Sequence, residues 1–137
     1  MFKVGFDFHG VVQAYPTEFK NLFAQMKLDG AVIGLITGAT KDQIHRELNE
    51  VGIEPTEFDF IHTIADYLID KHNVEFVADS KGNLWTDEKT WWSSKGKICN
   101  DLKIDMLFDD SIEYGDNMPI GTNFILFNDE LANLMFG

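Results

Sequence analysis

Carboxylates lie at or near the ends of two strand-like apolar segments that are far apart in the sequence. Residues 3–8 form a short apolar segment that carries Asp7 near its end, and Asp109 and Asp110 follow directly after the segment 104–108. Two carboxylates from different strands offer the oxygen ligands that Mg²⁺ prefers. A carboxylate can also attack phosphorus as a nucleophile. These residues therefore suit metal-assisted phosphoryl transfer.

Groups that bind phosphate oxygens stand at another expected strand end and at the start of an expected helix. Thr37 and Gly38 follow the apolar segment 31–36. A threonine hydroxyl and backbone N–H groups at a helix start can hold phosphate oxygens. Lys95 and Lys97 precede the acidic segment. An ammonium is a point charge that can neutralise both a carboxylate nucleophile and a transferring phosphoryl group.

The elements that must position these residues follow from apolar periodicity and turn signals. Strands are expected at residues 3–8, 31–36, 58–63, 104–108 and 123–127. Helices are expected after Pro16, after a capping box at 40–43, at 65–72, from 92 to about 103, and after Asn128. Residues 75–78 and 83–86 flank a turn and predict a β-hairpin.

This alternation predicts an α/β fold, a three-layer, doubly wound and mainly parallel sheet of the Rossmann-like kind with one small hairpin. In such sheets the active crevice lies beyond the carboxyl ends of the strands, where the candidate residues stand. The length of 137 residues predicts a single domain over residues 1–137.

Composition excludes several classes of protein. With 45% hydrophobic and 13% aromatic residues the chain can bury a core, which excludes a disordered protein. The formal net charge is −12, and seven acidic residues but no Lys or Arg occur from 104 to 137. That balance argues against long nucleic acid or an anionic membrane as partner. Cys99 is the only cysteine, so no disulfide or multi-thiolate zinc site forms within the chain. No segment approaches ~18 apolar residues, and we expect a soluble, cytoplasmic protein.

Four motifs in order resemble those of a known family. Asp-Phe-His-Gly-Val-Val at 7–12, then Thr37-Gly38, then Lys95, then Asp-Asp-Ser at 109–111 resemble motifs I to IV of the haloacid dehalogenase-like (HAD) hydrolase superfamily. The resemblance covers nearly the whole chain. It implies a strand order 3-2-1-4-5, which sets the first and fourth strands side by side.

The resemblance also implies a role for each residue. Asp7 would be the nucleophile that becomes an aspartyl-phosphate. Asp7, the main-chain carbonyl of His9 and the Asp109 carboxylate would ligate Mg²⁺, and Asp110 would support a metal-bound water. Thr37 would hold the phosphoryl oxygen.

The motif lysine has two candidates. The resemblance implies that Thr37, Gly38 and Lys95 together bind the phosphate. The family's pattern of a lysine four residues before a cysteine favours Lys95, four residues before Cys99, over Lys97.

His9 departs from the family pattern. The family's phosphatases usually carry a second aspartate there, which protonates the leaving oxygen and activates water. Imidazole exchanges its proton near neutral pH and can do both jobs, but it lacks the reach and charge of a carboxylate. The metal-ligating group is a backbone carbonyl and survives the substitution. Metal and phosphate binding are therefore better supported than turnover.

The spacing leaves no room for a large cap domain. One helix fits between Gly10 and Thr37, and one helix, strand, helix and hairpin fit between Thr37 and Lys95. Selectivity for a small phosphorylated substrate would then come from residues 13–16, from residues 85–92, or from a partner. Trp91 and Trp92 are expected to pack in the core or on the hairpin.

Two functions remain open. The first is a Mg²⁺-dependent phosphomonoesterase of low or specialised activity, with Asp7, His9, Thr37 and Lys95 as catalytic residues. The second is a non-catalytic HAD-like domain that binds metal, phosphate or a protein partner. A receiver domain of two-component signalling also uses acidic residues, Thr and Lys, but there the acidic pair follows the first strand and the lysine follows the last. In this sequence the acidic pair at 109–110 comes after Lys95 and no basic residue follows it, so a receiver domain is disfavoured.

Overall fold

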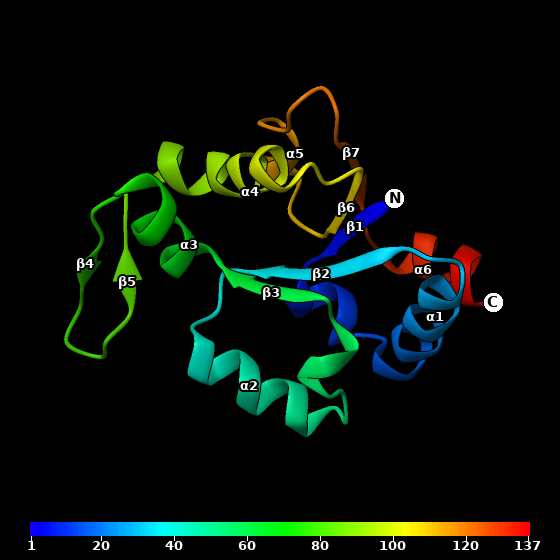
Figure 1. The fold of residues 1–137 in the computed structure, drawn as a ribbon. Coiled ribbons are helices and arrows are strands. Elements are labelled where there is room, and N and C mark those ends of the chain that lie inside the picture. Colours follow the sequence, from blue (N-terminus) through cyan, green and yellow to red (C-terminus); the bar gives the residue numbers. More distant parts are fainter.

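A parallel sheet of five strands forms the centre of the computed structural model, which describes residues 1–137 (Figure 1). The strands are β1 (Lys3–Phe6), β2 (Val32–Thr37), β3 (Phe60–Thr63), β6 (Met106–Asp109) and β7 (Asn123–Leu126). They lie in the order β3-β2-β1-β6-β7, and every neighbouring pair is parallel. Counted along the chain, this is the expected order 3-2-1-4-5. The predicted α/β class with a parallel sheet is confirmed.

The central strand β1 brings the ends of its two neighbours together. Gly5 of β1 pairs with Gly34 of β2 on one side and with Leu107 of β6 on the other. Directly after β1, the amide of Asp7 donates to the carbonyl of Phe108 at 2.9 Å. Asp7 therefore follows β1 at the same edge of the sheet where β6 ends at Asp109.

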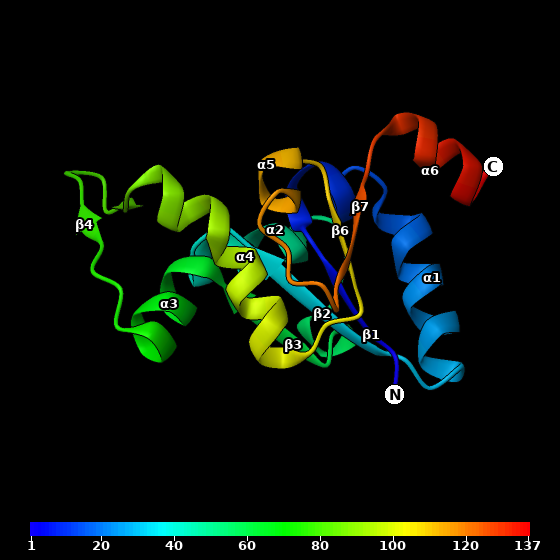
Figure 2. The same ribbon diagram turned by 90° about the horizontal axis from the view of Figure 1, so that it is seen from above.

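Helices cover both faces of the sheet (Figures 1 and 2). The helices α1 (Pro16–Leu28), α2 (Lys41–Glu50) and α6 (Asp129–Phe136) contribute to one cluster of 16 buried residues. The helices α3 (Ile64–His72), α4 (Glu88–Leu102) and α5 (Ile112–Gly115) contribute to a second cluster of nine, on the other face. The sheet between two layers of helices gives the three-layer arrangement that the sequence predicts.

Phenylalanines dominate the first cluster. The ring of Phe6 lies 5.6 Å from that of Phe19 and 5.0 Å from that of Phe23, both edge-on, and stacks on Phe108 at 5.2 Å. Aromatic contacts of this kind add about 0.5–1.5 kcal/mol per pair to the gain from burial. They hold β1 and β6 in place beneath the carboxylates.

A small antiparallel hairpin projects beyond α3, as the sequence predicts. It consists of β4 (Val77–Ala78) and β5 (Leu84–Trp85) and lies at one end of the molecule (Figure 1). The carboxylate of Asp79 organises its turn and accepts hydrogen bonds from the amides of Lys81 and Asn83, both at 2.9 Å.

Several boundaries differ from those expected. β1 ends at Phe6, because the chain turns into an irregular helical segment, η1 (Phe8–Val12), in which Gly10 adopts a φ of 75°. α4 begins earlier than expected, at Glu88, because Asp87 caps it by accepting from the Thr90 amide at 2.8 Å. β3 begins later, at Phe60, after the short 3₁₀ helix η2 (Pro55–Glu57).

None of the helices combines the length and the hydropathy needed to cross a membrane.

Candidate functional site

Aspartates from two strand ends meet beyond the carboxyl edge of the sheet. One carboxylate oxygen from each of Asp7, Asp109 and Asp110 can be chosen so that all lie within 4.8 Å of one another. Asp7 and Asp109 are buried, whereas Asp110 is exposed. The adjacent strands β1 and β6 thus bring together the acidic residues that the sequence singled out.

Lys95 bridges the two buried carboxylates. Its Nζ donates to Oδ1 of Asp7 at 2.9 Å and to Oδ2 of Asp109 at 2.5 Å, and its side chain is 1% exposed. The same ammonium lies 4.5 Å from the ring centre of Tyr114, a cation–π contact. Of the two lysines that the sequence left open, Lys95 is the one that reaches the carboxylates. Lys97 is exposed on α4.

Burial and charge act in opposite directions on these groups. Burial acts to lower the pKa of Lys95, but the Asp7 and Asp109 carboxylates outweigh it, so the pKa is raised and the ammonium stays charged. Burial raises the pKa of Asp7 to about 6, against the opposing effect of Lys95. Burial also raises the pKa of Asp109. Buried carboxylates that are costly to ionise are a common feature of functional sites.

The donor set fits a divalent cation that prefers oxygen ligands. Oδ1 of Asp7 is bonded to Lys95, whereas its Oδ2 accepts no hydrogen bond from the chain. The Asp110 carboxylate lies against Gly10, where a Cβ atom would overlap it. Glycine at this position therefore provides both the positive φ and the space that Asp110 occupies. Carboxylates and a carbonyl are the ligands that Mg²⁺ takes, together with several waters.

The loop after β2 holds the predicted phosphate-binding residues. Thr37 ends β2, and its Oγ1 accepts a hydrogen bond from the Ala39 amide at 3.2 Å. The Thr37 side chain is fully buried in this conformation, whereas Gly38 is exposed. Gly38 is therefore the more accessible of the two predicted phosphate-binding residues. Thr40 caps α2 by accepting from the Gln43 amide at 3.2 Å, which the capping box predicts.

The imidazole of His9 is held by Glu47, a residue that the sequence reading did not single out. Nε2 of His9 lies 2.5 Å from Oε2 of Glu47, on α2. The carboxylate accepts further hydrogen bonds from Gln43 at 2.7 Å and Gln13 at 3.3 Å. Burial acts to raise the pKa of Glu47, but the hydrogen bonds from Gln43 and His9 outweigh it and lower the pKa. A carboxylate can only accept a hydrogen bond, so Nε2 of His9 is the donor in this contact.

Glu47 and Tyr114 carry little signal in the sequence. Glu47 lies on an amphipathic helix among other charged residues, and nothing in its spacing relates it to His9, 38 positions away. Tyr114 lies in the short helix α5, which no apolar stripe predicts. Both residues act on the site through tertiary contacts alone.

No known protein-family model matches the sequence, and no curated protein is significantly similar to it. The fold and the side-chain arrangement therefore carry the functional argument. They define an α/β domain with a lysine-bridged acidic cluster at the carboxyl edge of its sheet.

Proposed function

We propose that this protein is a Mg²⁺-dependent phosphomonoesterase of the HAD-like kind that acts through an aspartyl-phosphate on Asp7. The observation that carries the proposal is the contact of one buried ammonium, Lys95, with both Asp7 and Asp109, next to Asp110. A nucleophilic carboxylate, an oxygen-rich cation site and a fixed positive charge are what phosphoryl transfer requires.

In this proposal the chain's own groups perform distinct tasks. Oδ2 of Asp7, which no donor in the chain engages, attacks phosphorus; the Asp7–phosphorus bond forms as the bond from phosphorus to the leaving oxygen breaks. The leaving oxygen takes a proton and departs as the alcohol. Water then attacks the same phosphorus, releases inorganic phosphate and regenerates the Asp7 carboxylate. Lys95 holds the nucleophile in place throughout.

Asp7, Asp109 and the carbonyl of His9 would hold Mg²⁺, and Asp110 would support a water on the ion, which would supply positive charge to the phosphoryl oxygens. The exposed backbone of Gly38, with Thr37 beneath it, would hold those oxygens on the opposite side. This placement is supported by β2 and β6 flanking β1 in the sheet.

His9 is the proposed proton donor to the leaving oxygen and the base for the attacking water. Support comes from the Glu47 contact, because a carboxylate that fixes one imidazole nitrogen orients the other for proton transfer. This role for His9 replaces that of the aspartate that the resemblance calls for.

The same Glu47 contact supports a second candidate, a domain that binds Mg²⁺ and phosphate without turnover. The hydrogen bond to Glu47 holds the His9 imidazole against α2, and no hydrogen bond joins the ring to Asp7. In that case the site would recognise phosphorylated ligands and release them unchanged.

A hydrolysis assay on a panel of phosphomonoesters, with Mg²⁺ and with EDTA, separates the two candidates. The proposal expects Mg²⁺-dependent release of phosphate that Asp7→Asn abolishes. The matched control is Asp116→Asn, on an exposed aspartate beyond the site, which should retain full activity. Mg²⁺ binding without phosphate release from any ester would establish the non-catalytic alternative.

A further inference from the structure

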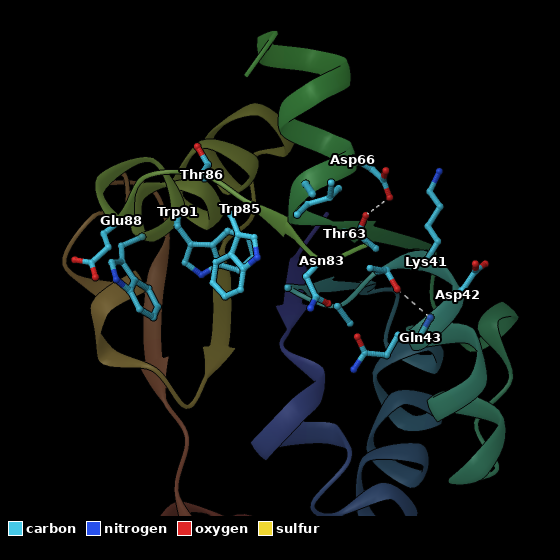
Figure 3. Close-up of a pocket in the computed structure, with 16 residues that line it drawn as sticks. Lys41, Asp42, Gln43, Thr63, Asp66, Asn83, Trp85, Thr86, Glu88 and Trp91 are labelled. Atoms are coloured by element: carbon cyan, nitrogen blue, oxygen red, sulfur yellow. Dashed lines mark hydrogen bonds between the residues drawn. The ribbon is translucent and has the colours of Figure 1, made fainter. Parts of the chain in front are cut away.

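A pocket of about 750 Å³ adjoins the candidate site, and its walls come from elements distant in the sequence. Figure 3 shows Trp85 and Trp91 on the side formed by the hairpin and α4, and Lys41, Asp42, Gln43, Thr63 and Asp66 on the side formed by the starts of α2 and α3. This is the volume of a site for one small organic molecule.

The first wall is aromatic and held in place. Trp85 is 59% exposed, yet its indole N–H donates to Oδ2 of Asp79 at 3.0 Å. Asn83, which also lines the pocket, donates to the same carboxylate at 3.2 Å. The Asp79 carboxylate thereby fixes both pocket residues. An exposed indole that is anchored by its edge presents its ring face to whatever enters.

Polar amide groups line both walls, Asn83 in the hairpin turn and Gln43 at the start of α2. Asn83 and Gln43 each use their amide nitrogen within the chain, on Asp79 and on Glu47 at 2.7 Å, which leaves each amide oxygen to accept a hydrogen bond. Thr86 also lines the pocket, on the same side as Trp85 and Trp91 (Figure 3). The pocket therefore combines flat apolar surface with acceptor groups suited to the edge of a ring.

The pocket shares residues with the proposed phosphate site, although the three aspartates do not line it. Gly38 lies against the indole of Trp91, where an added Cβ would be 2.9 Å from the ring. Gln43 lines the pocket and donates to Glu47, whose other oxygen holds His9. A phosphate on Gly38 would thus project its leaving group into the pocket beside the proposed proton donor.

We infer that this pocket binds the nucleobase of a nucleoside monophosphate, so that the substrate class of the phosphomonoesterase is nucleotides; the inference rests on the proposed function. A nucleobase has flat faces for the indoles and a polar edge for Asn83 and Gln43. A plain sugar phosphate would leave Trp85 uncovered, and a phenyl ring would offer no donor to the amide oxygens of Asn83 and Gln43.

The charges around the pocket further restrict which nucleotides it accepts. Asp42, Asp66 and Glu88 line it, against a single Lys41. An acidic rim disfavours a leaving group that carries phosphates of its own. The site therefore favours monophosphates over diphosphates and over the phosphorylated ends of polynucleotides.

The first test compares kcat/KM for adenosine 5′-monophosphate with kcat/KM for ribose 5-phosphate, which has the same phosphate and sugar but no base. The wild-type protein should prefer the nucleotide by about tenfold or more, the scale of one base–indole stack. In Trp85→Ala this ratio should fall toward one. Val77→Ala is the control, because Val77 pairs with Trp85 in the same hairpin, is 72% exposed and lies outside the pocket.

The second test measures binding of adenosine, which has no phosphate, by titration calorimetry in EDTA. Wild type and Asp7→Asn should bind it, and Trp85→Ala should bind it about tenfold more weakly. Adenosine binding without hydrolysis of any ester would sustain the pocket and reject the phosphatase. Hydrolysis of ribose 5-phosphate with no preference for the nucleotide and no binding of adenosine would overturn the inference and leave the phosphatase standing.

Discussion

Nζ of Lys95 lies 2.9 Å from Oδ1 of Asp7, although 88 positions separate the two residues in the sequence. The contact forms because β1 and α4 converge at the carboxyl edge of the sheet, and it is closed to solvent on the lysine side. A buried ammonium between carboxylates is an arrangement that folding alone does not favour, because desolvating the charges costs more than an apolar replacement would. Its presence supports the proposed functional site at this edge of the sheet.

Removing that ammonium should destabilise the protein. Lys95→Met leaves the buried carboxylates of Asp7 and Asp109 facing each other without a counter-charge, and the expected loss is about 3–5 kcal/mol of unfolding free energy. Urea unfolding in EDTA measures it. Lys97→Met, on the exposed side of the same helix, should change the unfolding free energy by less than about 0.5 kcal/mol. Equal stability of wild type and Lys95→Met would mean that the ion pairs do not form.

Mg²⁺ binding should depend on Asp109 far more than on neighbouring acidic residues. Asp109→Asn removes a carboxylate of the cluster, and we expect roughly tenfold or greater weakening of the Kd for Mg²⁺ in titration calorimetry. Glu113→Gln removes an exposed charge nearby and should leave the Kd within about twofold. If both variants weakened binding to the same extent, Mg²⁺ would be held by a diffuse acidic surface.

The turnover of alkyl phosphates should respond to the residue at position 9. His9→Ala should lose activity, because general acid–base help of this kind contributes about 10²–10⁴-fold. His9→Asp restores the family pattern and should raise turnover of alkyl phosphates by about tenfold or more.

Glu47 complicates the His9→Asp substitution, because the new aspartate would face the carboxylate that now holds the imidazole. The double variant His9→Asp/Glu47→Gln removes this repulsion and should show the larger gain. If the wild type hydrolyses alkyl phosphates rapidly, and both His9→Asp and the double variant lower the rate, His9 is itself an adapted catalyst. Inert variants that still bind Mg²⁺ would favour the non-catalytic domain.

A network between α3 and α4 should make stability depend on pH. The Asp101 carboxylate accepts hydrogen bonds from the Tyr67 hydroxyl and from His72, both at 2.8 Å. Burial acts to raise the pKa of Asp101, but these partners outweigh it and lower the pKa. Because the folded-state pKa lies below the unfolded one, the stabilisation is present above the unfolded pKa of ~3.9 and is lost as pH falls through the folded value.

The Asp101→Asn variant tests this network. It should lose up to about 1 kcal/mol at pH 7, the scale of a partly exposed ionic contact. The difference from wild type should shrink as the pH falls below about 4. Thermal unfolding across this pH range measures both, and a difference that did not vary with pH would contradict the ionic account.

The fold could be predicted from the sequence because its strands are short, apolar and separated by clear helical stripes. The apolar segment 31–36 predicts a buried parallel strand, and β2 (Val32–Thr37) lies within one residue of these bounds. Boundaries were less predictable where a cap decided them. α4 begins at Glu88 because Asp87 caps it, whereas its apolar stripe becomes visible only from Trp92.

In the candidate site, the sequence predicted the strand-end residues and, through the motif spacing, Lys95, which contacts Asp7 and Asp109. Asp7, Thr37 and Asp109 stand at strand ends, where the chemistry of parallel sheets concentrates. The contact of Glu47 with His9 arises from tertiary packing, and the contact of Trp85 with Asp79 arises from the hairpin turn. Neither contact can be predicted from the periodicity of the sequence. Trp92 packs against Tyr114 with ring centres 4.8 Å apart, and Trp91 and Trp92 both pack on the core, as expected, but both also line the pocket.

The central claim is that Asp7 carries the phosphoryl group, and trapping that group tests it most directly. The protein is mixed with Mg²⁺ and a phosphomonoester, quenched in acid within the first turnover, and mapped by peptide mass spectrometry. We expect one added phosphoryl group on the peptide that contains Asp7, labile to hydroxylamine as an acyl phosphate is, and none in Asp7→Asn. Phosphate release that persists in Asp7→Asn, or a phosphoryl group found on another residue, would contradict the account.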